Sequence, residues 1–124
     1  DIIYIFLMNT VGQIYERPWG TYRTIEQKDN YQLKHIVVKP GKRLSLQYHH
    51  SRDEHWTVIK GKGTVQLDEI SVDLELNGRI FIPKLAKHRM SNNTEDDVEF
   101  LEIQIGDYLG EDDIVRVEDD FGRK

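Results

Sequence analysis

The chain has 124 residues, which suits one domain of ordinary size and leaves no room for a second. Hydrophobic residues make up 38% and charged residues 31%, so a soluble globular domain is expected. The net charge of −5 disfavours a broad surface for nucleic acid or anionic membranes, although it permits a local basic pocket for a phosphate. There is no cysteine, which excludes disulfides and thiolate metal sites.

The most apolar run is residues 1–8, at the start of the sequence. It is too short to span a bilayer and lacks the basic start and small-residue cleavage site of a signal peptide. Two interpretations stay open: a buried or exchanged β-strand, or a natural start at Met8 with an added segment ahead of it. We treat residues 1–16 as an N-terminal strand or arm, and we expect residues 2–8 to pair with a neighbouring subunit, which predicts a homodimer. A cytoplasmic location, with no nucleic-acid or membrane partner, is expected.

The remainder, residues 17–124, is predicted to be one all-β domain with an acidic tail from about residue 109. Short segments between turn signals alternate apolar and polar residues, as half-buried strands do. We predict strands at 22–27, 33–38, 44–49, 55–60, 64–67, 72–76, 80–82, 88–91 and 98–105. In the last of these, Val98, Phe100, Glu102 and Gln104 share one face. The tail either holds one short helix or wraps the domain. Strands this short and evenly spaced predict a sandwich or barrel, such as a jelly roll.

Four residues in two distant segments are candidate metal ligands. Gln47 and His49 lie two apart on a predicted strand and so share a face, and Glu54 follows five positions later. His88 lies far away in sequence. Together they offer nitrogen and oxygen donors that suit Zn, Fe, Mn, Co or Ni without choosing among them. Singly, each is more often a structural or solvated residue, so the hypothesis depends on their joint spacing.

The same spacing resembles the two sequence motifs of the cupin family. The first motif is Gly-x5-His-x-His-x3/4-Glu-x6-Gly, and it is matched at Gly41, His49, Glu54 and Gly61, with Gln47 in place of the first histidine. The second motif is Pro-x-Gly-x2-His-x3-Asn, and it is matched at Pro83, His88 and Asn92, with Leu85 in place of the glycine. The resemblance implies a cupin, a double-stranded β-helix or jelly-roll barrel.

A closer resemblance, from residue 17 to residue 123, is to the type II mannose-6-phosphate isomerases. The segments that carry it are Arg17-Pro-Trp-Gly20, Lys39-Pro-Gly41, Leu44-Ser-Leu-Gln47, Glu54-His-Trp56, Ile82-Pro83, His88-Arg89, Leu101-Glu-Ile-Gln104, Tyr108-Leu-Gly-Glu-Asp-Asp-Ile-Val-Arg116 and Asp119-Asp-Phe-Gly-Arg123. In that family glutamine stands at the first ligand position, which agrees with Gln47. Two departures are Ser51, where the family often has a third histidine, and Phe121, where tyrosine is common.

The resemblance implies a metal-dependent isomerase that interconverts mannose 6-phosphate and fructose 6-phosphate, feeding GDP-mannose and polysaccharide synthesis. The family domain is often the C-terminal part of a longer enzyme that also makes GDP-mannose, and nothing here resembles the nucleotide-binding start of a nucleotidyltransferase. A stand-alone isomerase and an excised domain both stay open.

Such an enzyme needs a base to move a proton between two sugar carbons, and cations to bind the phosphate. Candidates for the base are His50, Glu54 and Glu102. Arg52 is a candidate for catalysis and for the phosphate, and the other phosphate candidates are Arg116, Arg123, Lys87 and Arg89. Two rival classes are a non-catalytic cupin that binds a metal or sugar, and a metal-free sugar-nucleotide epimerase of cupin fold.

Overall fold

The computed structural model describes residues 8–123, which form eleven β-strands and no helix. The strands are β1 (Ile14–Arg17), β2 (Gly20–Gln27), β3 (Tyr31–Val38), β4 (Leu46–Tyr48), β5 (Arg52–Lys60), β6 (Gly63–Leu67), β7 (Ile70–Leu74), β8 (Arg79–Ile82), β9 (His88–Ser91), β10 (Val98–Gly106) and β11 (Val115–Glu118). The all-β prediction is confirmed, and all nine predicted strands are present: β9 has the predicted bounds and the other eight have shifted ends. Strands β1 and β11 were not predicted, and the tail forms β11 instead of a helix.

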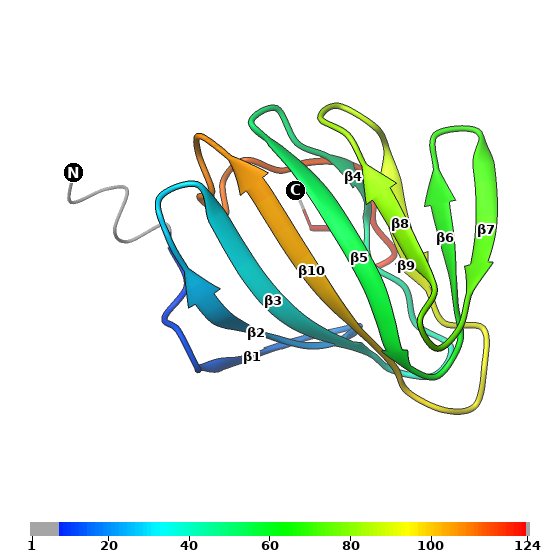
Figure 1. Ribbon diagram of the computed structural model, residues 1–124. Coiled ribbons are helices and arrows are strands. Elements are labelled where there is room, and N and C mark those ends of the chain that lie inside the picture. Colours follow the sequence, from blue (N-terminus) through cyan, green and yellow to red (C-terminus); the bar gives the residue numbers. More distant parts are fainter. Residues whose placement is uncertain (1–7, 124) are drawn as a thin grey trace.

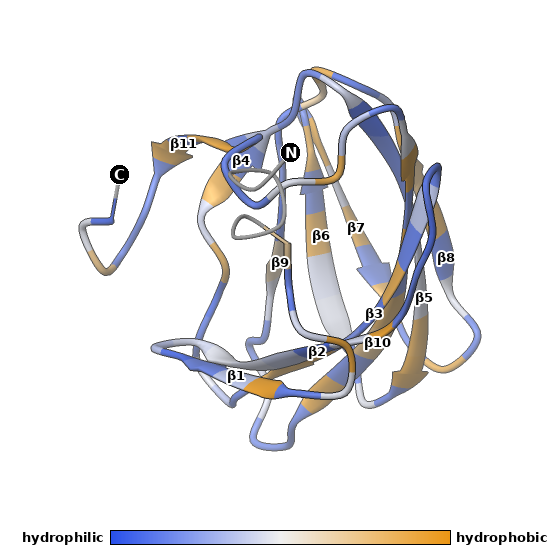
Figure 2. Ribbon diagram, turned by 90° about the vertical axis from the view of Figure 1, so that its left-hand side faces the viewer, coloured by the Kyte–Doolittle hydropathy of each residue, from blue (hydrophilic) through white to orange (hydrophobic). Residues whose placement is uncertain are grey.

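The strands form two antiparallel sheets that enclose the interior (Figure 1). The larger sheet has the order β1-β2-β3-β10-β5-β8, and the smaller has the order β11-β4-β9-β6-β7. Figure 2 looks into the space between them, with β1 and β2 on one side and β4 and β11 on the other. These four strands come from the two ends of the chain and its middle, and each contributes residues to the lining of one cavity.

The inward faces of β3, β5 and β10 form a series of cross-strand rows. At one end, Ile36, Phe100 and Val58 lie side by side and are almost completely buried. The alternation predicted for β10 is confirmed, because the four residues predicted to share one face are all buried. Toward the other end the same faces carry polar side chains. The hydrophobic core therefore fills only part of the interior.

Within residues 8–123, no helix is long and apolar enough to cross a membrane. The segment from which the homodimer is predicted, residues 2–8, lies outside the described residues except for Met8. The homodimer therefore stays a prediction.

Candidate metal centre and adjoining cavity

His49, Glu54 and His88 converge in the interior. They lie just after β4, within β5 and at the start of β9, and each contributes one donor atom within 4.8 Å of the others. Their side chains are only 1–2% exposed. Gln47, the fourth candidate ligand, pairs with His88 across β4 and β9, and its Oε1 accepts a hydrogen bond from Ser45 Oγ at 2.8 Å. The structure thus brings three candidate ligands together and places the fourth beside them.

Both histidines are oriented by backbone carbonyls. His49 Nδ1 lies 2.5 Å from the carbonyl oxygen of Asp113, and His88 Nδ1 lies 2.8 Å from that of Ala86. A carbonyl only accepts hydrogen bonds, so each Nδ1 carries a proton, and each Nε2 is the ring nitrogen that lies toward Glu54. The Nε2 atom of His88 is buried and has no hydrogen-bond partner among the described residues.

A tight turn over residues 83–87 precedes His88. Leu85 donates its backbone N–H to the carbonyl oxygen of His49 at 2.9 Å, which links the turn to the end of β4. Leu85 has a φ of 70°, in the left-handed region that glycine tolerates best. This is the position where the second cupin motif has glycine, so the leucine keeps the glycine conformation.

Glu54 is held by two donors. Trp56 Nε1 bonds its Oε1 at 2.9 Å, and Arg52 Nε bonds its Oε2 at 3.0 Å. Burial raises the pKa of Glu54, but His49, Arg52 and His88 outweigh this effect and hold the pKa well below its ordinary value. Burial lowers the pKa of His49 to about 4, so its imidazole is neutral near pH 7.

This donor set fits a divalent metal. It provides two imidazole nitrogens and one carboxylate oxygen, and one of these nitrogens, His88 Nε2, is buried without a hydrogen bond among the described residues. Imidazole and carboxylate ligands suit first-row transition ions. His49, Glu54 and His88 would hold such an ion, with Gln47 adjacent to them on β4.

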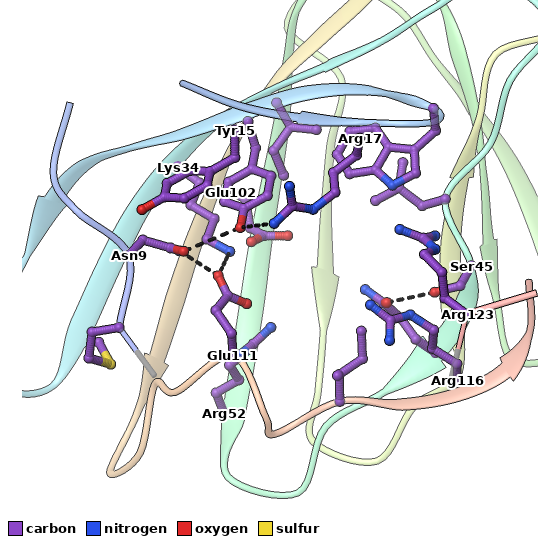
Figure 3. Close-up of a pocket in the computed structure, with 17 residues that line it drawn as sticks. Asn9, Tyr15, Arg17, Lys34, Ser45, Arg52, Glu102, Glu111, Arg116 and Arg123 are labelled. Atoms are coloured by element: carbon purple, nitrogen blue, oxygen red, sulfur yellow. Dashed lines mark hydrogen bonds and ion pairs between the residues drawn. The ribbon is translucent and has the colours of Figure 1, made fainter. Parts of the chain in front are cut away.

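A cavity of about 350 Å³ adjoins this cluster (Figure 3). Two residues in its wall connect it to the metal ligands: Arg52, which bonds Glu54, and Gln47, which pairs with His88. Five cationic side chains contribute to the lining, namely Arg17, Lys34, Arg52, Arg116 and Arg123. The described residues of the lining include only two acidic side chains, Glu102 and Glu111. The cavity is therefore suited to an anion.

Arg116 and Arg123 lie on one side of the cavity, away from Lys34 and Glu111, whereas the Arg17 guanidinium donates to the hydroxyl of Tyr22 at 3.2 Å (Figure 3). Arg17 comes from β1 and Arg116 from β11, where Arg116 pairs with Gln47 of β4. Burial and the nearby guanidinium groups of Arg123 and Arg17 lower the pKa of Arg116. Arg123 is held by Asp119, whose Oδ2 accepts a bond from Nε at 2.8 Å.

Glu102 lies between Lys34 and Trp56 in a cross-strand row and is 5% exposed. Burial, followed by the charge of neighbouring Glu54, raises the pKa of Glu102 to about 8. Its Oε2 accepts a bond of 2.7 Å from Gln104 Nε2. Lys34 Nζ bonds Glu111 Oε1 at 2.7 Å and lies 4.6 Å from the centre of the Tyr22 ring.

Sequence reasoning missed Arg17, Lys34 and Glu111 as lining residues. Lys34 could have been found from the sequence, because it shares one face of a predicted strand with the apolar Ile36 and Val38. Arg17 lies in a family motif but precedes the first predicted strand, and the structure shows that it belongs to β1.

Three candidate site residues belong neither to the metal-ligand cluster nor to the lining of the cavity. His50 is exposed, with its ring edge against Tyr48. Lys87 is also exposed. Arg89 is buried, but its Nε donates to the carbonyl oxygen of Leu44 at 3.1 Å and its Nη1 to Glu118 at 3.3 Å. The structure gives Arg89 a role in joining β9 to the segment before β4 and to β11.

The two antiparallel sheets and the buried His-Glu-His cluster define a cupin. Its architecture is similar to that of an oxalate decarboxylase from Lactobacillus farciminis, with a TM-score of 0.73 and 16% identity over 85% of this chain and 33% of that one. A cupin-2 domain from Rhodospirillum rubrum gives a TM-score of 0.69 at 16% identity, over 82% of this chain and 76% of that one. At this identity the likeness concerns the fold alone.

Residues 8–119 match the family model described as "Mannose-6-phosphate isomerase C-terminal", and the chain belongs to this family. It is 48% identical over 107 residues to the alginate biosynthesis protein AlgA of Pseudomonas aeruginosa, covering 86% of this chain and 22% of AlgA. It is 48% identical to the xanthan biosynthesis protein XanB of Xanthomonas campestris pv. campestris, covering 86% and 23%. Mannose-1-phosphate guanylyltransferase of Escherichia coli is 45% identical, with 86% and 22% covered. The chain thus spans less than a quarter of these relatives.

Proposed function

We propose that this domain is a metal-dependent aldose-ketose isomerase that interconverts mannose 6-phosphate and fructose 6-phosphate. The observation that carries the proposal is the cavity, which is lined by several arginines and adjoins the buried metal-ligand cluster through Arg52 and Gln47. A sugar phosphate has the matching chemistry, because its hydroxyl and carbonyl oxygens suit a metal and its phosphate suits arginine. Family membership supports the same reaction.

The arginine cluster is assigned to the substrate phosphate. Arg17, Arg116 and Arg123 come from the two ends of the chain and line the same cavity. Guanidinium groups bind phosphate by planar, two-pronged hydrogen bonding. Arg116 and Arg123 were candidates from sequence, and Arg17 joins them from the structure. A phosphate held here would direct the reacting end of the sugar toward Glu102 and Arg52.

Glu102 is assigned the proton transfer between C1 and C2 of the open-chain sugar. A base must lie within hydrogen-bond reach of the proton that it moves, and the Glu102 side chain lines the cavity. His50, by contrast, is exposed outside it, and Glu54 is occupied by Trp56 and Arg52. A divalent ion bound by His49, Glu54 and His88 would supply Lewis-acid stabilisation of the charge that develops on the sugar oxygens.

The relatives that make alginate and xanthan motivate a role in supplying mannose units for polysaccharide synthesis, through GDP-mannose. We include that role in the proposal and do not take it over from AlgA as a finding, since the chain spans only 22% of AlgA. A homodimer and a cytoplasmic location belong to it as well.

The test is an isomerase assay on protein stripped of metal by a chelator. Formation of fructose 6-phosphate from mannose 6-phosphate is followed by a coupled assay after adding Zn, Fe, Mn, Co or Ni singly. We expect no turnover without metal and restored turnover with at least one ion. Full activity in the stripped protein would contradict a metal-dependent mechanism. Tight metal binding without turnover under any of these ions would favour the non-catalytic cupin.

The substitution Glu102→Gln tests the base separately. Glutamine keeps the size of the side chain and an oxygen that can accept the bond from Gln104, but it cannot take a proton. We expect kcat to fall by roughly 10²–10⁴-fold, the usual contribution of a general base, with metal stoichiometry unchanged. Unchanged kcat would assign the proton transfer to another group.

A further inference from the structure

We propose that Asp113 is a positioning residue for the metal centre, through which the C-terminal segment 109–113 fixes the orientation of His49. The inference rests on the metal site of the proposed function and concerns a residue of the acidic tail that the sequence did not single out. Asp113 is 64 residues from His49 in sequence, yet it contacts three consecutive residues at the end of β4.

Asp113 binds the turn between β4 and β5 through both its backbone and its side chain. Its carbonyl oxygen accepts the Nδ1–H of His49 at 2.5 Å. Its carboxylate accepts the backbone N–H groups of His50 and Ser51, each at 3.0 Å. The two oxygens bond different donors, so the turn cannot rotate without breaking one of these bonds. The residue is 9% exposed, which shields these bonds from competing water.

The segment that carries Asp113 is itself anchored independently of a metal. Leu109 is fully buried, and the N–H of Asp113 bonds the carbonyl of Gly110 at 3.1 Å. Glu111 bonds Lys34 and also Asn9, and the three side chains lie together on one side of the cavity (Figure 3). The tail therefore presents a fixed acceptor to His49, in the manner of the outer groups that orient metal-ligating histidines.

This arrangement has a consequence for metal affinity. A histidine whose Nδ1 partner is displaced loses both its preferred tautomer and its ring orientation, and removal of such partners typically lowers metal affinity by about 10–100-fold. The carboxylate of Asp113 does not bond the His49 side chain. It holds the turn after β4 in place relative to the Asp113 carbonyl that His49 contacts. Losing the carboxylate should weaken metal binding even though the carbonyl remains in the backbone.

The experiment compares Co²⁺ and Zn²⁺ affinities of the wild type, Asp113→Ala and Asp113→Asn, measured by the Co²⁺ absorption spectrum and by chelator competition. We expect Asp113→Ala to weaken binding by about 10–100-fold. Asparagine keeps one acceptor oxygen, so Asp113→Asn should recover part of the affinity. The matched control is Asp119→Ala, which removes another tail carboxylate that accepts backbone N–H groups, those of Phe121 and Arg123. Its metal affinity should equal that of the wild type.

Equal affinities in wild type and Asp113→Ala would overturn the inference, and so would an equal loss in Asp119→Ala. A wild-type protein that binds neither ion would instead contradict the metal site of the proposed function. If Asp113→Ala does not fold, hydrogen exchange in the wild type decides the matter. Coupling between sites is reciprocal, so metal should slow exchange at the amides of His50 and Ser51. Unchanged exchange at both amides on metal addition would overturn the inference.

Discussion

The two ends of the interior are built from the same three strands but have opposite chemistry. On β3, β10 and β5, one row holds Ile36, Phe100 and Val58, and the row two residues further along holds Lys34, Glu102 and Trp56. The next row is Gln32, Gln104 and Glu54. Each strand keeps the same face turned inward along these rows. Six of the nine side chains are at most 1% exposed, and Ile36, Lys34 and Glu102 are 4–6% exposed. The strands thus supply a core at one end and a site at the other.

The polar end is stable because its buried groups bond one another. Gln104 donates to Glu102 at 2.7 Å, Gln32 donates to Gln104 at 2.9 Å, and Thr24 donates to Gln32 at 2.6 Å. A buried polar group without a partner costs free energy, whereas a continuous chain of bonds offsets that cost and fixes each side chain. We infer that the apolar end determines stability and the polar end determines chemistry.

The largest expected effect is at the polar end. His88→Ala removes a metal ligand, and metal-based charge stabilisation is worth several kcal/mol, so isomerase activity should fall by roughly 10³-fold or more. The bound metal per chain should fall with it, as measured by atomic emission after dialysis, while the circular dichroism spectrum keeps its β signature. Full metal content together with lost activity would show that His88 has another role.

The apolar end should respond in the opposite way. Phe100 is fully buried and its ring lies 4.7 Å from that of Trp56, so Phe100→Ala leaves a cavity in the core. Such substitutions lower the free energy of unfolding by about 3–5 kcal/mol. Denaturant titration measures the loss, and the folded fraction should still bind metal with unchanged stoichiometry. A Phe100→Ala protein as stable as the wild type would contradict the inference that the apolar end determines stability.

A smaller effect is expected in the arginine cluster. Arg116→Ala removes a charged hydrogen-bond donor worth about 1.5–3 kcal/mol, so kcat/KM for mannose 6-phosphate should fall by roughly 10–100-fold. Activity on unphosphorylated mannose, where measurable, should change little. The matched control is Arg43→Ala, which removes an arginine from an exposed pair with Asp120 that does not line the cavity. An equal loss with both sugars would assign Arg116 to structure.

The sequence predicted nine of the eleven strands and the candidate ligand cluster, because both leave local patterns. Strand alternation has a period of two, and His49 and Glu54 lie within one short segment. The cavity has no such pattern, since it joins Arg17 of β1 to Arg116 of β11 across almost the whole chain. Asp113 illustrates the limit most clearly: in sequence it is one acid among several, and only the fold places it against the turn after β4. Long-range pairing of a short tail strand cannot be inferred from local propensity.

The smallest expected effects come from two separate substitutions, one at each end of the interior, which replace a hydroxyl by a methyl group or a methyl group by a hydroxyl. Thr24 and Val58 are both fully buried, and valine and threonine have nearly the same shape. Thr24→Val removes the bond to Gln32 Oε1, which Asn9 still contacts at 3.3 Å, so the loss should be only about 0.5–1.5 kcal/mol. Val58→Thr places a hydroxyl among apolar neighbours and should lower the free energy of unfolding by about 1–3 kcal/mol. Denaturant titration of both variants gives the comparison directly. If Thr24→Val proved the more costly of the two, the polar end would contribute to stability as much as to chemistry, and the division between the ends would have to be abandoned.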